Sequence, residues 1–166
     1  TIRIFMPHSI SSLRLAEQGK LLTHQKDTAV LTLMNLESVL ERDFEVVSPD
    51  MTLGEMVSVI SVSHRNSFPV VDERGMLVGI VELDNVRNIM FRPELYDRYK
   101  VRKIMVTPEV KVSSATPMTE VMRLFDETKA WKMPVVDEEG RYLGFISKSA
   151  IFNSYREVLN CTFIGD

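Results

Sequence analysis

The sequence predicts a mixed α/β (α+β) fold, in which two copies of a β-α-β-β-α unit, related by a pseudo-twofold axis, form one compact module. The first observation is a repeated stretch: residues 68–82 read FPVVDERGMLVGIVE, and residues 133–147 read MPVVDEEGRYLGFIS, 65 positions later. The second is that the same shift aligns the chain without a gap from Val47 to Val86. A gapless match across helix, turn and strand indicates an internal duplication.

The first half of each copy is expected to be a short strand followed by a helix. Residues 44–47, FEVV, form the expected strand, and a Pro-Asp turn follows it at residues 49–50. Apolar residues then recur at helical spacing in both copies: Leu53, Met56, Val57 and Ile60 in the first, and Met118, Val121, Met122 and Phe125 in the second. Thr52 and Glu55 fit a capping box, and Pro117 suits a first helical position.

The second half of each copy is expected to be a hairpin followed by a last helix. FPVV and MPVV are continuous apolar runs, as in strands that are covered on both faces. DERG and DEEG are turns in which glycine takes a positive φ, and MLVGIV and YLGFI are the returning strands. The last helices are predicted from Val86, Ile89 and Met90 in the first copy and from Ile151, Tyr155, Val158 and Leu159 in the second.

The remaining segments define the organisation of the chain. Residues 1–35 are assigned to an N-terminal linker and helix, 36–97 to the first copy with its linker, 98–160 to the second copy, and 161–166 to a tail. Residues 27–40 look helical, and residues 91–105, FRPELYDRYKVRKIM, look like a polar linker. One copy is too small to bury both faces of its strands, so the copies are expected to stack. Stacking leaves two equivalent clefts between them.

Composition excludes several classes of function. The net charge of −3 argues against a nucleic-acid partner, which normally binds a basic protein. A single cysteine, Cys161, cannot form an internal disulfide and favours a reducing compartment. The three histidines have no metal-ligand spacing. Phosphate-loop and nucleophile-elbow motifs are absent from the sequence, so no catalytic residue is predicted.

The stretches FPVVDERGMLVGIVELDNV and MPVVDEEGRYLGFISKSAI, each with a strand and helix before it, resemble the tandem cystathionine-β-synthase (CBS) domain pair, or Bateman module. The resemblance covers about residues 36–159. It implies a regulatory module without catalytic activity of its own. It also implies that no cofactor is required and that ATP, ADP or AMP binds in a cleft between the repeats, weakly or not at all.

A finer resemblance lies partly outside the repeats. Residues 7–27, PHSISSLRLAEQGKLLTHQKD, look like the segment that joins the membrane part of ClC-type chloride channels and transporters to their cytoplasmic CBS pair. Residues 91–105 and the stretch GFISKSAIFNSYREVL look like bacterial members of that family. The resemblance implies a homodimeric cytoplasmic domain of an inner-membrane protein, with a chloride-transporting transmembrane domain upstream in the same chain. Alternatives are a ligand-free assembly scaffold and the CBS pair of another ion transporter or of an enzyme.

The resemblance also implies which residues would meet a nucleotide. In nucleotide-binding CBS repeats the returning strand ends G-h-h-[ST]-x-x-D, where h is apolar and the Asp binds the ribose. The first copy has Glu82 and Asn85 at the hydroxyl and Asp positions. A carboxylate at a helix N-terminus repels phosphate, so this half-site is expected to be poor. The residues before the proline, which present backbone to the adenine, are Ser67 and Phe68.

The second copy is expected to be the better half-site. Ser147 matches the hydroxyl position and Lys148 adds positive charge, but Ala150 replaces the ribose Asp. Loss of a charge-assisted hydrogen bond costs roughly 1.5–3 kcal/mol. Lys132 and Met133 precede Pro134 and complete the predicted half-site. A structural interpretation stays open, in which Ser147 is an ordinary N-cap and Gly79 and Gly144 only permit close packing.

Overall fold

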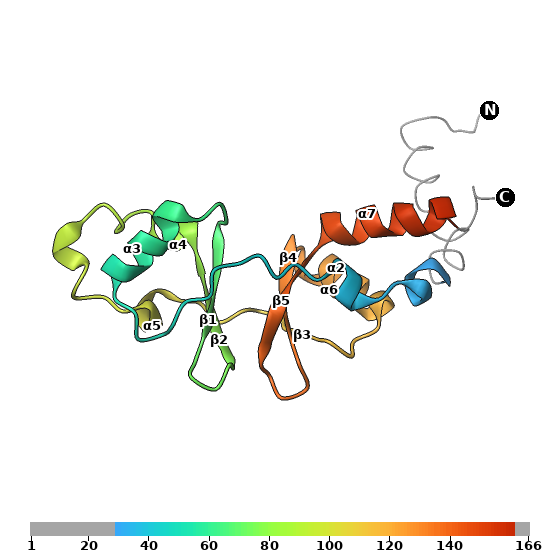
Figure 1. Cartoon of the computed structure of the whole chain (residues 1–166), viewed down its shortest axis with the longest axis horizontal. Helices are drawn as coiled ribbons and strands as arrows, with labels where there is room; N and C mark the ends of the chain where they lie inside the picture. Colours follow the sequence, from blue (N-terminus) through green and yellow to red (C-terminus); the bar gives the residue numbers. More distant parts are fainter. Residues whose placement is uncertain (1–28, 162–166) are drawn as a thin grey trace, which may run out of the picture.

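Two small sheets face each other in the middle of the molecule, and helices cover their outer sides (Figure 1). The structure is a computed structural model that describes residues 29–161. The predicted segment 7–27 and residues 162–166 of the predicted tail therefore lie outside the described residues. The arrangement confirms the α+β fold class with two sheets.

The first repeat is built around a two-stranded antiparallel sheet. Its elements are α3 (Leu53–Val62), β1 (Ser67–Val71), β2 (Leu77–Glu82) and α4 (Leu83–Val86). The predicted capping box is confirmed, because the Thr52 hydroxyl accepts a hydrogen bond from the Glu55 amide while the Glu55 carboxylate accepts one from the Thr52 amide. The expected last helix is a single helical turn followed by further turns, and Pro93 stands where the second repeat has Val158. Proline has no amide hydrogen and restricts the residue before it, so a long helix cannot continue there.

The second repeat has a three-stranded sheet in the order β3-β4-β5. Its elements are β3 (Val112–Ser113), α6 (Met118–Thr128), β4 (Lys132–Val136), β5 (Tyr142–Ser147) and α7 (Lys148–Leu159). β3 pairs in parallel with β4, and β4 pairs antiparallel with β5. Pro117 is the N-cap of α6 rather than its first helical residue.

The two hairpin turns meet on the pseudo-twofold axis. Gly75 and Gly140 have φ of +85° and +94°, as the turn prediction requires. Met76 forms an antiparallel bridge with Arg141, and the repeat shift maps one of these residues onto the other. The amide of Leu77 donates to the Gly140 carbonyl at 3.2 Å, and the Tyr142 amide donates to the Gly75 carbonyl at 2.9 Å. The hairpins thus join the two sheets symmetrically.

The short helix at the N-terminal end of each repeat packs on the core of the other repeat. α2 (Leu36–Val39) shares a core cluster with Phe125 and Ile146 of the second repeat. α5 (Val101–Ile104), which is related to α2 by the repeat shift, shares a core cluster with Phe68 of the first repeat. Figure 1 shows α2 beside α6 and α5 on the side of α3. The repeats therefore exchange helices, which the sequence analysis did not predict.

The exchanged segments explain the two glycines in the returning strands, Gly79 of β2 and Gly144 of β5. After α2, Glu41 bridges Phe145 of β5; after α5, Val106 bridges Ile80 of β2. A Cβ at position 144 would lie 2.6 Å from the Glu41 carbonyl oxygen, and one at position 79 would lie 2.7 Å from Met105 Sδ. Because these two glycines have no side chain, the crossing segment can pass close to each strand. This supports the interpretation that Gly79 and Gly144 permit close packing.

Two predicted elements differ from the structure. Residues 44–47 do not form a strand: Val47 makes an isolated parallel bridge to Val70, while Phe44 turns toward the second repeat, where its ring stacks on Phe145. The expected polar linker is folded, with η1 (Pro93–Leu95) and α5 inside it and Val101 fully buried. The apolar pattern of α5 covers a single turn and is flanked by charged residues, so the sequence did not indicate a helix there.

The helix predicted for residues 27–40 is interrupted. Helical residues 29–33 and α2 are separated at residues 34–35. The Asn35 side chain accepts a hydrogen bond from the Glu37 amide at 3.0 Å and so starts a new helix as an N-cap. The first two residues of the predicted helix lie outside the described part of the chain.

Candidate functional site

The residues of the predicted second half-site lie at one end of the β4–β5 hairpin. Lys132 and Ser147 are cross-strand partners, and Met133 and Pro134 continue β4 into the core. Lys148 and Ala150 stand in the first turn of α7, directly after β5. The Lys148 amide donates to the Trp131 carbonyl at 3.0 Å, and its ammonium lies 4.0 Å from an Asp126 carboxylate oxygen. The fold thus brings this half-site together.

Ser147 caps α7. Its hydroxyl oxygen accepts a hydrogen bond from the Ala150 amide at 3.1 Å and lies 3.2 Å from the Ser149 hydroxyl. The capping role predicted by the structural interpretation is therefore present. The side chain is half-buried.

Replacing Ser147 by Ala is expected to lower the free energy of unfolding by about 1 kcal/mol, because an N-terminal amide of α7 loses its acceptor. Urea unfolding followed by circular dichroism measures the change. Ser149→Ala is the matched control, since Ser149 is exposed and caps nothing; it should stay within about 0.5 kcal/mol of the native chain. Equal stability of the native chain and Ser147→Ala would contradict the capping role.

The predicted first half-site is closed by its own side chains. Ser67 is fully buried, and its hydroxyl donates to the Glu82 carboxylate at 2.5 Å. Phe68 is fully buried, whereas Asn85 is exposed on α4. Glu82 precedes α4 without capping it. The pair of Ser67 and Glu82 occupies the positions that Lys132 and Ser147 hold in the second repeat.

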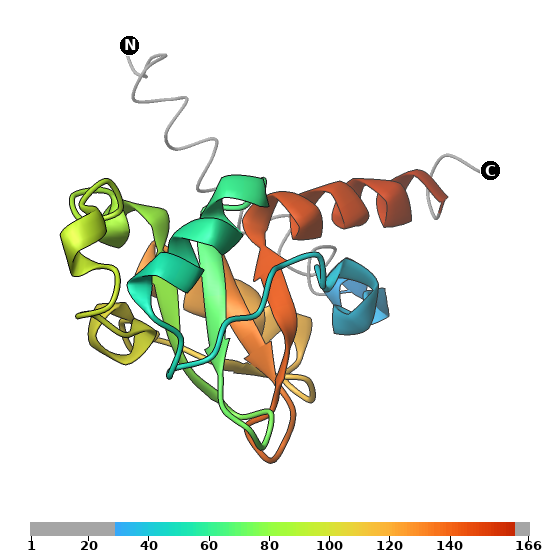
Figure 2. The same cartoon turned by 60° about the vertical axis from the view of Figure 1, so that its left-hand side comes forward.

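The cleft beside Ser147 contains a stack that the sequence analysis missed. Residues 41–46, here called the strap, lead from α2 past β5 to the first repeat, and Figure 2 shows this crossing. The Phe44 ring stacks on the Phe145 ring with centroids 4.5 Å apart and an interplanar angle of 28°. The Arg65 guanidinium lies 4.2 Å from the centroid of the Phe44 ring. Phe44 is thus contacted by a second-repeat ring and a first-repeat cation.

Polar contacts hold the strap against the first repeat. The Arg65 Nε donates to the Asp43 carbonyl at 2.8 Å, and the guanidinium also contacts the carboxylates of Asp43 at 3.1 Å and Glu41 at 3.4 Å. The Ser63 hydroxyl donates to the Glu45 carboxylate at 2.5 Å. Arg65 is 29% exposed and Glu41 31%, so their ion pair is partly shielded from water, whereas the Asp43 side chain is 93% exposed.

Two further side chains border the stack. The Lys132 ammonium lies 5.8 Å from the Phe44 ring centroid. Tyr142 packs edge-on to Phe145 with centroids 6.0 Å apart, and its hydroxyl is buried without a hydrogen-bond partner among the described residues. Burial raises the pKa of Tyr142 to about 12, and the positive charge of Arg65 opposes this shift. The phenol therefore stays protonated, with its donor unused within the described chain.

The two clefts differ chemically although the backbone repeats. The repeat shift places Glu109, Ala130, Ile80, Ser67 and Leu77 where the second cleft has Phe44, Arg65, Phe145, Lys132 and Tyr142, respectively. A comparison of the positions at which the two copies differ would have identified these five residues. The positions at which the copies agree indicate only the shared fold.

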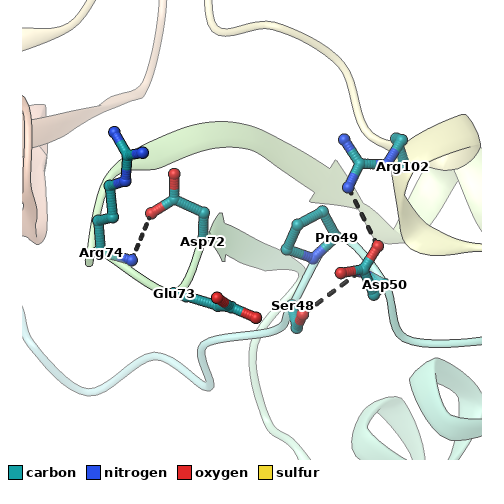
Figure 3. Close-up of a pocket in the computed structure, with 7 residues that line it drawn as sticks. All are labelled: Ser48, Pro49, Asp50, Asp72, Glu73, Arg74 and Arg102. Atoms are coloured by element: carbon teal, nitrogen blue, oxygen red, sulfur yellow. Dashed lines mark hydrogen bonds and ion pairs between the residues drawn. The ribbon is translucent and has the colours of Figure 1, made fainter.

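The surface hollow drawn in Figure 3 lies away from these residues. Figure 3 shows a pocket of about 280 Å³ beside the first hairpin turn, where Arg102 pairs with Asp50 at 3.0 Å. The Asp72 carboxylate there accepts from the amide of Arg74. This pocket contains none of the predicted site residues. We therefore place the candidate site at the stacked cleft, which side chains fill, rather than at this pocket.

Metal-ligating clusters and membrane-spanning helices are both absent from residues 29–161. No group of three or more potential metal-ligating His, Cys, Asp or Glu side chains occurs in that range. No helix in the same range has the length and apolar character needed to cross a membrane.

Comparison with known proteins identifies both repeats. The family model for the CBS domain matches residues 36–92 and 101–157. Inosine-5'-monophosphate dehydrogenase of Bifidobacterium longum is 34% identical over 113 residues, which are 67% of this chain and 20% of that protein. The magnesium transporter MgtE of Thermus thermophilus is 38% identical over 78 residues, 47% of this chain and 16% of that protein. The chain spans about a fifth of the length of the dehydrogenases it matches.

Solved structures show the same fold. The CBS domain of a bacterial CNNM/CorC family Mg²⁺ transporter, in complex with ATP, superposes with a TM-score of 0.66 at 14% identity. The match covers 82% of this chain and 97% of that one. At this identity the likeness concerns the fold alone.

Proposed function

The chain belongs to the CBS-domain family, and we propose that it is the regulatory CBS pair of an ion-transport protein of the ClC chloride type, sensing an adenine nucleotide in the cleft beside Ser147. The module has no chemistry of its own in this proposal. It acts as a homodimer in the cytoplasm, and ligand binding shifts the population of its arrangements. A transmembrane domain of the same chain, upstream of the repeats, receives the change.

The assignment to a transporter is supported by sequence. Residues 7–27 look like the segment that joins ClC membrane domains to their CBS pair, and residues 91–105 look like bacterial members of that family. Two of the similar proteins are magnesium transporters. They support attachment to an ion transporter in general, and residues 7–27 support the chloride type.

The single observation that carries the nucleotide proposal is the geometry of the Ser147 cleft. A planar ring lies there between an aromatic face and a guanidinium, a position that a purine base can take. Lys132 and Lys148 supply positive charge for a phosphate next to the N-terminus of α7. The similar transporter domain was solved with ATP, which agrees with a ligand of this class.

Isothermal titration of the chain with ATP, ADP, AMP and adenosine tests the proposal. We expect weak binding by the native chain, because Ala150 offers the ribose no acceptor. Ala150→Asp is expected to bind about tenfold to a hundredfold more tightly, since a charge-assisted hydrogen bond contributes roughly 1.5–3 kcal/mol. Asn85→Asp, the same change at the equivalent position of the first repeat, should leave affinity unchanged.

The opposite result is informative. No heat with any ligand up to millimolar concentration, in the native chain and in Ala150→Asp, would leave a scaffold that acts by assembly. Light scattering after size-exclusion chromatography tests the dimer separately. A strict monomer at high protein concentration would contradict it.

A second candidate is the regulatory CBS pair of an enzyme. The observation in its favour is the 34% identity to a dehydrogenase across two thirds of this chain. The full reading frame separates the candidates: a transmembrane domain supports the first, and a catalytic barrel supports the second.

A further inference from the structure

On the premise that an adenine nucleotide binds in this cleft, we propose that the strap is an internal competitor: Phe44 occupies the place of the base, and a nucleotide enters by displacing it. Arg65 and Phe145 then sandwich the base instead of the ring. The proposal assigns roles to residues that the sequence resemblance does not include.

The stack has the form of a ligand site that the chain itself fills. Phe44 belongs to neither sheet and contacts Phe145 from one side and the Arg65 cation from the other. It is only half-buried, unlike Phe145, which is 1% exposed. One face of the slot, Phe145, belongs to β5, and the other, Arg65, belongs to the short connection between α3 and β1. The inserted ring belongs to an irregular segment that can leave without unfolding a strand.

The contacts of the strap are of a kind that a nucleotide can replace. Arg65 is neutralised by Glu41 and Asp43, which both stand on the strap. A guanidinium also stacks on the flat face of a purine base, as it does on the Phe44 ring. Displacement would therefore exchange one ring for another against the same cation, so the closed and open arrangements can be close in free energy.

The closed arrangement also carries a cost. The buried Tyr142 hydroxyl lacks a hydrogen-bond partner among residues 29–161. An unsatisfied buried group of this kind costs about 1–3 kcal/mol. An occupant that brings an acceptor or admits water removes this cost, which favours exchange.

The strap connects the cleft to the rest of the module. It starts directly after α2, and Glu41 exchanges two hydrogen bonds with Phe145, from its amide at 2.7 Å and to its carbonyl at 2.9 Å. When Phe44 leaves the slot, the chain between α2 and Val47 must take another path. Ligand binding is thereby converted into a change at the N-terminal side of the first repeat.

Titration of Phe44→Ala in the whole chain tests the proposal. Removing the competitor should tighten binding of AMP and adenosine roughly tenfold or more, because the binding-competent fraction rises. Ribose 5-phosphate should gain nothing, since it has no base. Glu109→Ala is the matched control: Glu109 is exposed at the equivalent position of the other cleft, and its removal should not change affinity.

A second variant guards against misfolding. Glu45→Ala removes the acceptor of the Ser63 hydroxyl but keeps the Phe44 ring, so it should give a smaller gain in the same direction. Thermal melting tests whether each variant is folded. If Phe44→Ala is unfolded, the affinity of Glu45→Ala for AMP tests the proposal instead.

The possible outcomes separate this proposal from the function itself. Equal affinity of the native chain and Phe44→Ala for AMP would overturn the competing strap and leave the nucleotide site standing. Binding by Phe44→Ala without detectable binding by the native chain would support the strap and contradict nucleotide sensing by the native chain. No binding by either would overturn both.

Discussion

Gly144→Ala is expected to destabilise the module by about 3 kcal/mol, at the upper end of the usual cost of overpacking. The added methyl group would lie 2.6 Å from the Glu41 carbonyl oxygen and 3.0 Å from a Leu40 methyl carbon. A backbone oxygen cannot rotate away as a side chain can. The crossing chain must therefore shift, and the hydrogen bonds between Glu41 and Phe145 weaken.

The equivalent change in the first repeat provides the control. At Gly79 the nearest atom to a new methyl group is Met105 Sδ at 2.7 Å, on a flexible side chain. Gly79→Ala should cost about 1 kcal/mol, since Met105 can adopt another rotamer. Urea unfolding compares the two variants. A larger loss at Gly79 than at Gly144 would contradict the roles given to the crossing segments.

Phe145→Ala is expected to lower the free energy of unfolding by about 3–5 kcal/mol, the range for a large buried ring replaced by a methyl group. Phe145 is 1% exposed, and its ring contacts Phe44 and Tyr142 at the junction of the repeats. Phe44→Ala alone should cost less, because Phe44 is half-buried. Equilibrium unfolding of both single variants and the double variant forms a cycle.

The cycle should give a coupling of roughly 0.5–1.5 kcal/mol between the rings, as expected for stacked aromatic pairs. A matched cycle pairs Phe145 with Phe91, which is 77% exposed, and should be additive. Additivity of Phe44 with Phe145 would show that the stack contributes no specific energy, and the internal competitor would lose its physical basis.

The repeat made most of the fold predictable. Hairpins, turn glycines and the main helices follow from local signals that occur twice, such as the turn glycines Gly75 and Gly140, which both have positive φ. The exchange of α2 and α5 was not predictable in the same way. Each has one turn and two apolar residues, and nothing local shows which sheet they cover.

The candidate site was predictable only where it follows the family motif. Ser147 and Lys132 lie together because strand pairing places them opposite each other. Phe44 and Arg65 were missed because their contact depends on the crossing chain, and they stand 21 positions apart in segments read as strand and loop. Whether these residues bind a nucleotide is a prediction that titration tests.

The exchange of short helices determines where a mechanical load enters the module. A pull on the chain just before α2 acts first on the second repeat, since Leu36 and Val39 are seated in its core. The strap then transmits the force to the first repeat through its contacts with Arg65 and through the bridge that Val47 makes after it. A pulling force on the N-terminal side would therefore act on the contacts between the two repeats rather than unfold one repeat from its end.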